Sequence, residues 1–142
     1  MSVSWFPMAV HALALLSSSE DGYSSSYIAS SVNTHSVFLR RVLAKLVTTG
    51  ILDTKEGGGG GYRLAKPADQ LTLKEVYTAL EGKSFIASSP AEPNEKCPVG
   101  SGIRPAFQQL IDEVDELVLQ KLNDITIADV AQNAIDFGEL RV

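Results

Sequence analysis

Apolar residues recur at three- and four-residue intervals along much of the chain, which predicts amphipathic helices. The intervals are clearest over residues 5–17, 25–32, 35–48, 73–81 and 103–122, and a final helix is expected to begin at residue 127. Residues 51–55 and 62–65 are short apolar segments typical of strands. The pattern therefore predicts a mainly α-helical chain with one small β-hairpin.

Several of the predicted helix ends carry residues that stabilise helix termini. Ser24 is placed to cap the second helix, Asn33 suits a turn with positive φ, and Gly50 suits the left-handed position after the third helix. Two pairs have capping-box spacing: Thr72 with Glu75, and Thr126 with Asp129. These signals mark the boundaries of the helices along the chain.

Residues 25–44 have the spacing of a helix-turn-helix. In that motif the second helix presents its N-terminus to the DNA major groove, so its first residues contact bases and its basic residues contact bases or phosphates. The predicted DNA contacts here are Ser24, Thr34, His35, Ser36 and Arg40, with Arg41 and Lys45 directed to the phosphate backbone. An alternative to DNA binding that the sequence leaves open is a plain helical hairpin whose polar edge is solvated.

Five consecutive glycines, residues 57–61, separate the two predicted strands. A dinucleotide-binding loop is disfavoured because Tyr62 occupies its last glycine position, and a Walker loop is disfavoured because no Lys-Ser/Thr pair follows. A domain linker is disfavoured because both flanking segments are short and apolar. A hairpin after a helix-turn-helix is instead a wing, in which glycines permit close approach to DNA. The predicted wing contacts are Lys55, Gly59, Gly60 and Arg63.

The chain has 142 residues, a size typical of one domain, and a formal net charge of −5. Residues 1–66 carry six basic and four acidic side chains (+2), whereas residues 67–142 carry six basic and thirteen acidic ones (−7). The basic residues of the first part lie near the two motifs, which is compatible with a local DNA-binding face. No transmembrane segment or signal peptide is indicated. With a single cysteine in the chain, a reducing cytoplasm is the expected compartment.

The sequence offers few residues for other chemistry. Cys97 is the only cysteine, so an intrachain disulfide and a zinc site of several cysteines are excluded. His35 has no partner at ligand spacing, so no metal site is expected. No nucleophile–base set is present to indicate an enzyme.

Several segments together resemble the Rrf-type (BadM/Rrf-two) winged-helix transcriptional regulators, and two of them look closest to the YwnA-like branch. The matching segments are FPMAVHALALL, SSVNTHSVFLRRVLAKLVTTGIL, GGGGGYRLAKPADQLTLKEVYTALEG, NEKCPVG and TIADV. The resemblance implies a winged helix-turn-helix with a long C-terminal dimerisation helix, acting as a homodimer on a near-palindromic DNA operator, usually as a repressor. It assigns dimerisation to Ile103, Phe107, Leu110, Val114, Leu117 and Val118. This apolar stripe is broader than packing against its own domain requires, which agrees with contact to a second subunit. The alternative is that the stripe packs only within its own chain.

The expected domain division is 1–82 for DNA binding, 83–102 for a linker or effector loop rich in Pro, Ser and Gly, and 103–142 for the dimerisation and C-terminal helices. Cluster-binding members of the family carry three cysteines in that loop, so with one cysteine we expect no iron–sulfur cluster and no other cofactor. A winged-helix module that binds protein rather than an operator is the alternative function.

Cys97 follows Lys96 and precedes Pro98, a favoured first helical residue. A thiol at a helix N-terminus beside a cation has a lowered pKa and is more reactive. Two hypotheses stay open: oxidation or modification of Cys97 weakens operator binding, or Cys97 is a small apolar residue packed in a loop. The effector, an oxidant or a small molecule, is not identified by the sequence.

Overall fold

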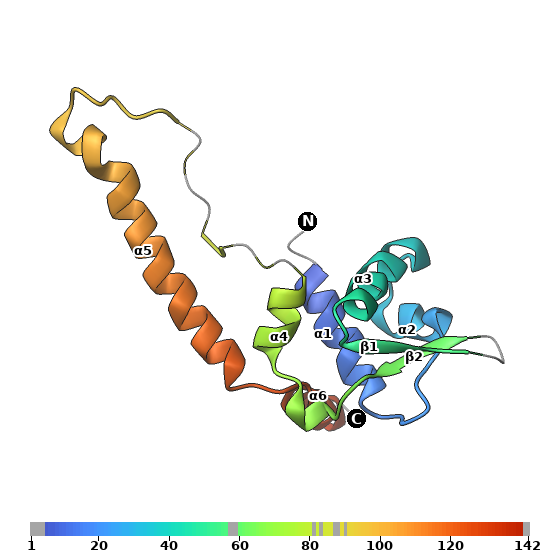
Figure 1. The fold of residues 1–142 in the computed structure, drawn as a ribbon. Helices are drawn as coiled ribbons and strands as arrows, with labels where there is room; N and C mark the ends of the chain where they lie inside the picture. The colour runs from blue at the N-terminus through green and yellow to red at the C-terminus, as the bar shows by residue number, and fades with distance from the viewer. Residues whose placement is uncertain are drawn as a thin grey trace. The chain divides into compact units, whose positions relative to one another are not determined.

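The computed structural model describes residues 5–56, 60–80, 82, 84–86, 89 and 91–140. Its elements, in chain order, are α1 (Trp5–Leu16), α2 (Ser25–Val32), α3 (Ser36–Thr48), β1 (Leu52–Lys55), β2 (Gly61–Leu64), a short 3-10 helix η1 (Ala68–Gln70), α4 (Leu73–Ala79), α5 (Pro98–Asn123) and α6 (Ile127–Glu139) (Figure 1). The two strands form an antiparallel hairpin. This architecture confirms the predicted fold class, helical with a hairpin wing and a long helix.

The chain forms two compact units. The first comprises Met1–Gly82 with Leu122–Val142, and the second comprises Lys83–Lys121. The expected division groups residues 103–142, whereas α6 lies in the first unit. Packing explains the difference, because α6 contacts α1 and η1 and its Ile127 is fully buried.

The core of the first unit is built from the inward faces of its helices and of β1. The buried positions recur at helical intervals on α1 and α3, as the apolar pattern predicts. The side chains without solvent exposure are Ala9, Ala12, Leu13, Ile28, Leu39, Val42, Leu43, Leu46, Leu71, Val76 and Ile127. This core holds α2, α3 and the hairpin in one fixed arrangement.

A backbone bridge joins the start of α4 to the start of α6. The Leu73 N–H donates to the Ile125 carbonyl at 2.9 Å, and the Ile127 N–H donates to the Leu71 carbonyl at 2.8 Å. Because these four groups lie some fifty residues apart in sequence, no local pattern predicts their pairing. The bridge fixes the C-terminal helix to the N-terminal unit.

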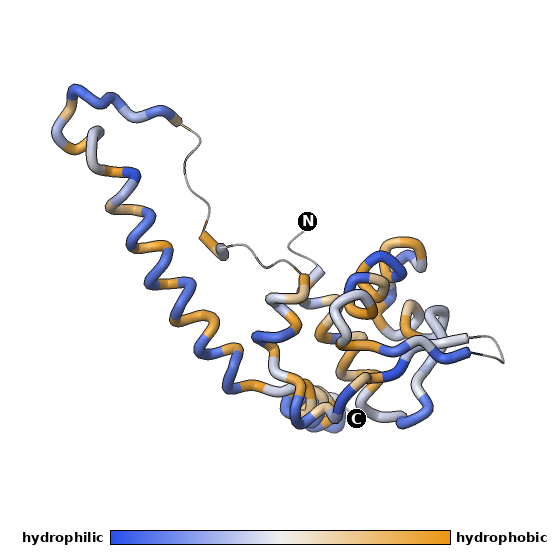
Figure 2. The backbone as a smooth tube through the Cα atoms, viewed as in Figure 1, coloured by the Kyte–Doolittle hydropathy of each residue, from blue (hydrophilic) through white to orange (hydrophobic). Residues whose placement is uncertain are grey.

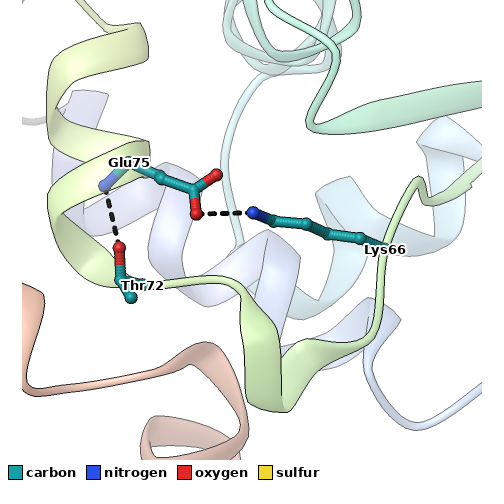
Figure 3. Close-up of polar contacts among 3 residues, drawn as sticks. All are labelled: Lys66, Thr72 and Glu75. Carbon is teal, nitrogen blue, oxygen red and sulfur yellow. Dashed lines mark hydrogen bonds and ion pairs between the residues drawn. The ribbon is translucent and has the colours of Figure 1, made fainter.

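The two expected capping boxes have different outcomes. At α6 the box is complete: Thr126 Oγ1 accepts from the Asp129 N–H at 3.1 Å, and the Asp129 carboxylate accepts from the Thr126 N–H at 3.0 Å. At α4 only the first half forms, with Thr72 Oγ1 accepting from the Glu75 N–H at 3.2 Å. The Glu75 carboxylate instead pairs with Lys66 (Figure 3). A competing cation therefore replaces the backbone donor.

Helix boundaries differ from the predicted ones at three places. His35 is the N-cap of α3 rather than its first residue, and α4 ends at Ala79 rather than near residue 81. The long helix begins at Pro98, five residues before the predicted start. Proline is well accommodated at a first helical position because its missing N–H has no helical acceptor. Gly100 and Gly102 are poor helix formers, so the sequence pattern does not indicate a helical turn here.

Candidate nucleic-acid interface

The turn between α2 and α3 has the geometry that a helix-turn-helix requires. Asn33 adopts a left-handed conformation (φ 59°, ψ 52°), and its N–H donates to the Ala29 carbonyl at 2.8 Å. Ala29 is buried, and its small side chain leaves room for two crossing helices. The predicted role of Asn33 is therefore confirmed, and the turn directs α3 away from α2.

The start of α2 is held by its cap. Ser24 Oγ accepts a hydrogen bond from the Tyr27 N–H at 3.2 Å and lies 3.1 Å from Ser26 Oγ. Ser24 is half-buried, and its predicted contact with DNA stays a prediction. Its established contribution is to start the first helix of the motif.

Helix α3 has one buried face and one exposed face. Leu39, Val42, Leu43 and Leu46 are buried in the core. The side chains predicted to contact DNA lie at the start of this helix or on its exposed face: His35, Ser36, Arg40 and Arg41 are exposed, while Thr34 and Lys45 are half-buried. His35 has extended backbone and makes no side-chain capping bond, so its ring is not used to start the helix.

Strand register determines which wing side chains share a face. The pairs are Leu52 with Leu64, Asp53 with Arg63, Thr54 with Tyr62, and Lys55 with Gly61. Because side chains alternate along a strand, Lys55 and Arg63 lie diagonally on the same face, and Asp53 lies on that face directly opposite Arg63. All three are exposed, whereas Leu52 is buried on the opposite face. The two predicted wing cations are therefore neighbours, and an acidic side chain accompanies them.

The tip of the wing is only partly described. Gly59, predicted to approach DNA, lies outside the described residues. Gly60 and Gly61 have φ of 71° and 155°, a region that side chains rarely allow. The glycines at the described end of the run therefore supply a backbone path that other residues would resist.

Sequence reasoning missed a contact that attaches the wing to the helix-turn-helix. The Tyr23 N–H donates to the Tyr62 carbonyl at 3.0 Å, and the Tyr62 N–H donates to the Tyr23 carbonyl at 2.9 Å. The neighbouring Gly22 has φ 80°, and a Cβ there would overlap the Tyr62 carbonyl oxygen. The Asp-Gly dipeptide signals a turn at this position, although nothing in it identifies the partner.

The exit of the wing is attached to α4. Lys66 lies two residues after the end of β2, and its Nζ donates to the Glu75 carboxylate (Figure 3). Both side chains are partly solvent-exposed, so the pair contributes little to stability, of the order of 0–1 kcal/mol. Its effect is mainly geometric, because it orients the segment between the wing and α4.

In the second unit, α5 carries an apolar stripe with little intrachain cover. Figure 2 shows hydrophobic and hydrophilic residues alternating along this helix, and only Ile111 is buried among its described residues. Of the six predicted dimerisation residues, Ile103, Leu110 and Leu117 are 44%, 49% and 65% exposed, and Phe107, Val114 and Val118 are half-buried. An exposed stripe of this length is atypical of a helix that packs only within its own chain.

Described residues of the segment before α5 contact that helix at two places. Arg104 donates to the Ala91 carbonyl at 2.7 Å and lies 3.3 Å from the Glu92 carboxylate. The Ser84 hydroxyl donates to Asp115 at 3.0 Å. Between segment and helix is an open cavity of about 990 Å³, lined by Ser89, Ala91, Pro93, Ile103, Arg104, Phe107, Gln108 and Ile111. The predicted linker therefore includes ordered contacts within this unit.

Cys97 is exposed at the N-terminus of α5. Backbone hydrogen bonds from Gly100 and then from Val99 hold the pKa of its thiol below the ordinary value, slightly opposed by desolvation. The lowered pKa agrees with the prediction for a helix N-terminus. The exposed position disfavours the alternative of a packed apolar residue.

Among the helices of the described residues, none is long and apolar enough to cross a membrane.

Similarity to known proteins covers most of the chain. YwnA of Bacillus subtilis (strain 168), named as a regulator of the HTH type, is 35% identical over 123 residues, which span 87% of this chain and 91% of that protein. The solved structure of T. potens IscR has a TM-score of 0.71 at 20% identity, covering 94% of this chain and 88% of that one. A structure named as a transcriptional regulator from Lactobacillus plantarum has a TM-score of 0.77 at 22% identity, covering 92% and 89%. These structures share the fold of this chain.

The sequence model of the Rrf2 family, described as iron-dependent transcriptional regulators, matches residues 4–133. The donor set of this chain does not suit a metal centre of the kind that iron dependence implies. The chain has one cysteine, and within the described ranges no three His, Cys, Asp or Glu residues form a group able to hold a metal ion. Since the family match nevertheless spans both the winged helix and the long helix, the chain belongs to the Rrf2 family of transcriptional regulators.

Proposed function

We propose that the protein is a homodimeric repressor that binds a near-palindromic DNA operator through α3 and the wing. The supporting observation is that one unit carries both an exposed α3 face and an exposed wing face with two cations. The +2 charge of residues 1–66 agrees with a DNA-facing surface, while the −7 charge of the remainder disfavours binding through bulk charge.

The two cationic elements have different tasks in this proposal. Helix α3 enters the major groove, where His35, Ser36 and Arg40 contact base edges. Lys55 and Arg63 on the wing contact phosphate or the adjacent minor groove. The Tyr23–Tyr62 bridge supports this division, because it ties the wing to the segment that starts α2.

The α5 stripe supplies the dimer contact. Ile103, Leu110 and Leu117 are exposed at seven-residue spacing, as in the seam between two long helices. Two copies related by a two-fold axis would bury each stripe against the other and present two α3 helices to a near-palindromic site. The resemblance to the Rrf-type regulators implies a homodimer, which supports the same arrangement.

Cys97 supplies a route to regulation. Its thiolate attacks one oxygen of a peroxide, which yields a sulfenic acid and releases hydroxide. The modified sulfur then loses its hydrogen bonds from the backbone of Gly100 and Val99 at the start of α5. We expect α5 to shift as a result, so that the spacing of the two α3 helices in the dimer no longer matches the spacing of the operator half-sites. The protein is expected in the cytoplasm, where a reduced thiol is the resting state.

Salt-dependent binding tests the proposal. Footprinting on genomic fragments, beginning with the protein's own upstream region, locates the operator, and titration from 50 to 200 mM salt gives the slope of log K against log salt. Each phosphate contact contributes about 0.9 to that slope, so Lys55→Ala with Arg63→Ala should flatten it by about 3.6 in a dimer. Lys74→Ala, which removes an exposed cation on α4, is the control and should leave the slope unchanged.

Three outcomes of this experiment are informative. An unchanged slope in the double variant would contradict wing contacts. A parent protein that occupies no site in the genome would contradict operator binding and favour the protein-binding module. Higher expression of the adjacent gene in a strain lacking the protein supports repression, and lower expression would indicate an activator.

A further inference from the structure

One apolar side chain on the exposed face of α3 has no role in the core. Val37 is the second residue of α3 and is 64% exposed. At about 100° per residue, it lies nearly opposite the centre of the buried face formed by Leu39, Val42, Leu43 and Leu46. The Val37 side chain therefore points into solvent, where a polar side chain would be better solvated.

The neighbours of Val37 define the chemistry of that face. Arg41 follows at i+4 and Ala44 at i+7, and both are exposed. An arginine suits guanine or phosphate, but an isopropyl group can contact neither favourably. The only apolar group on the edges of the bases in the major groove is the 5-methyl group of thymine.

We propose that Val37 reads a thymine by packing its isopropyl group against the 5-methyl group of that base, once in each half-site of the operator. The inference rests on the proposed function, because it requires α3 to enter the major groove. It adds a determinant of specificity to the polar contacts of His35 and Ser36. Val37 lies in the first turn of α3, and the N-terminal residues of a recognition helix are the ones that contact base edges.

The expected effect follows from the size of the contact. Removing one buried methyl group costs about fourfold in affinity, and the loss is about fifteenfold when both half-sites are changed. An effect of this size is readily measured by fluorescence anisotropy. It is also distinct from loss of a phosphate contact, because it depends on one base and hardly changes with salt concentration.

Deoxyuridine scanning tests the proposal. Each thymine of the footprinted operator is replaced in turn by deoxyuridine, which pairs identically but lacks the methyl group. The parent should lose about fourfold in affinity at one thymine per half-site, and Val37→Ala should bind thymine and deoxyuridine equally there. Val99→Ala removes a comparably exposed valine (70%) from α5 and should leave the scan unchanged.

The outcomes separate this inference from the proposed function. A parent that binds its operator without any sensitivity to deoxyuridine would overturn the role of Val37, as would a Val37→Ala variant that keeps the parent's sensitivity. A parent that binds no operator would instead overturn the proposed function itself. Unfolding by urea checks that Val37→Ala is as stable as the parent, as expected for an exposed helical position.

Discussion

Tyr23 and Tyr62 exchange two backbone hydrogen bonds, at 3.0 and 2.9 Å, although 39 positions separate them in the sequence. The pairing extends the hairpin by one bridge and attaches it to the residue before the Ser24 cap. The start of the helix-turn-helix and the wing thus share one hydrogen-bonded junction. Displacement of either element would break that junction, so the two are expected to move together.

The junction depends on Gly22. Gly22→Ala should destabilise the fold by more than about 3 kcal/mol, because the new Cβ would overlap the Tyr62 carbonyl oxygen and φ is already 80°. Gly50→Ala is the matched control: Gly50 has the same φ, and a Cβ there would have nothing within 4 Å. That variant should lose only about 1 kcal/mol. Urea unfolding measures both, and equal losses would show that the close approach to Tyr62 is unimportant.

Asp53 is expected to weaken DNA binding. It lies directly opposite Arg63 and on the same exposed face as Lys55. Asp53→Asn removes an acidic group from the wing and should raise operator affinity about two- to fivefold at low salt, with a smaller gain at higher salt. Asp69→Asn on η1 is the control and should change affinity little. Unaltered binding by the Asp53 variant would indicate that this wing face is turned away from DNA.

The α5 stripe is expected to hold the dimer. Leu110→Glu with Leu117→Glu places charge on two exposed apolar positions and should weaken self-association about a thousandfold or more, giving monomers in analytical ultracentrifugation. Gln109→Glu with Gln120→Glu adds the same charge at exposed polar positions of the helix and should leave the dimer intact. A dimer that survives the leucine changes would place the interface elsewhere.

The pH dependence of Cys97 follows from the direction of its pKa shift. Hydrogen bonds from the backbone of Gly100 and Val99 favour the thiolate in the folded chain, so the pKa of Cys97 is lower there than in the unfolded chain. Alkylation by iodoacetamide should therefore reach half its maximal rate at a lower pH in native protein than in urea. Coincident profiles would show that the start of α5 does not activate the thiol.

The local signals in the sequence predicted most of the winged helix. Asn33 and Gly50 are the residues that tolerate positive φ, and the structure has them at 59° and 80°. The hairpin was predictable because a run of glycines separates two short apolar segments. Each of these predictions depends on residues that are close together in the chain.

The features that were missed depend on residues far apart or on competing partners. Tyr23 and Tyr62 pair through backbone atoms, so the pattern of side chains along the sequence does not predict their pairing. Glu75 had a suitable capping position, but Lys66 offered a stronger, charged donor. The DNA contacts themselves stay predictions, since exposure shows which side chains are available and not which ones touch a base.

The bridge between the starts of α4 and α6 has a consequence for how the protein is made. Ile127 is fully buried in the same core as Leu13 and Leu39, so that core lacks a member until the segment after α5 has been synthesised. A nascent chain ending after α4 would expose the site that Ile127 later covers. The winged-helix unit is therefore completed only after α5, the helix proposed for dimerisation, has been synthesised.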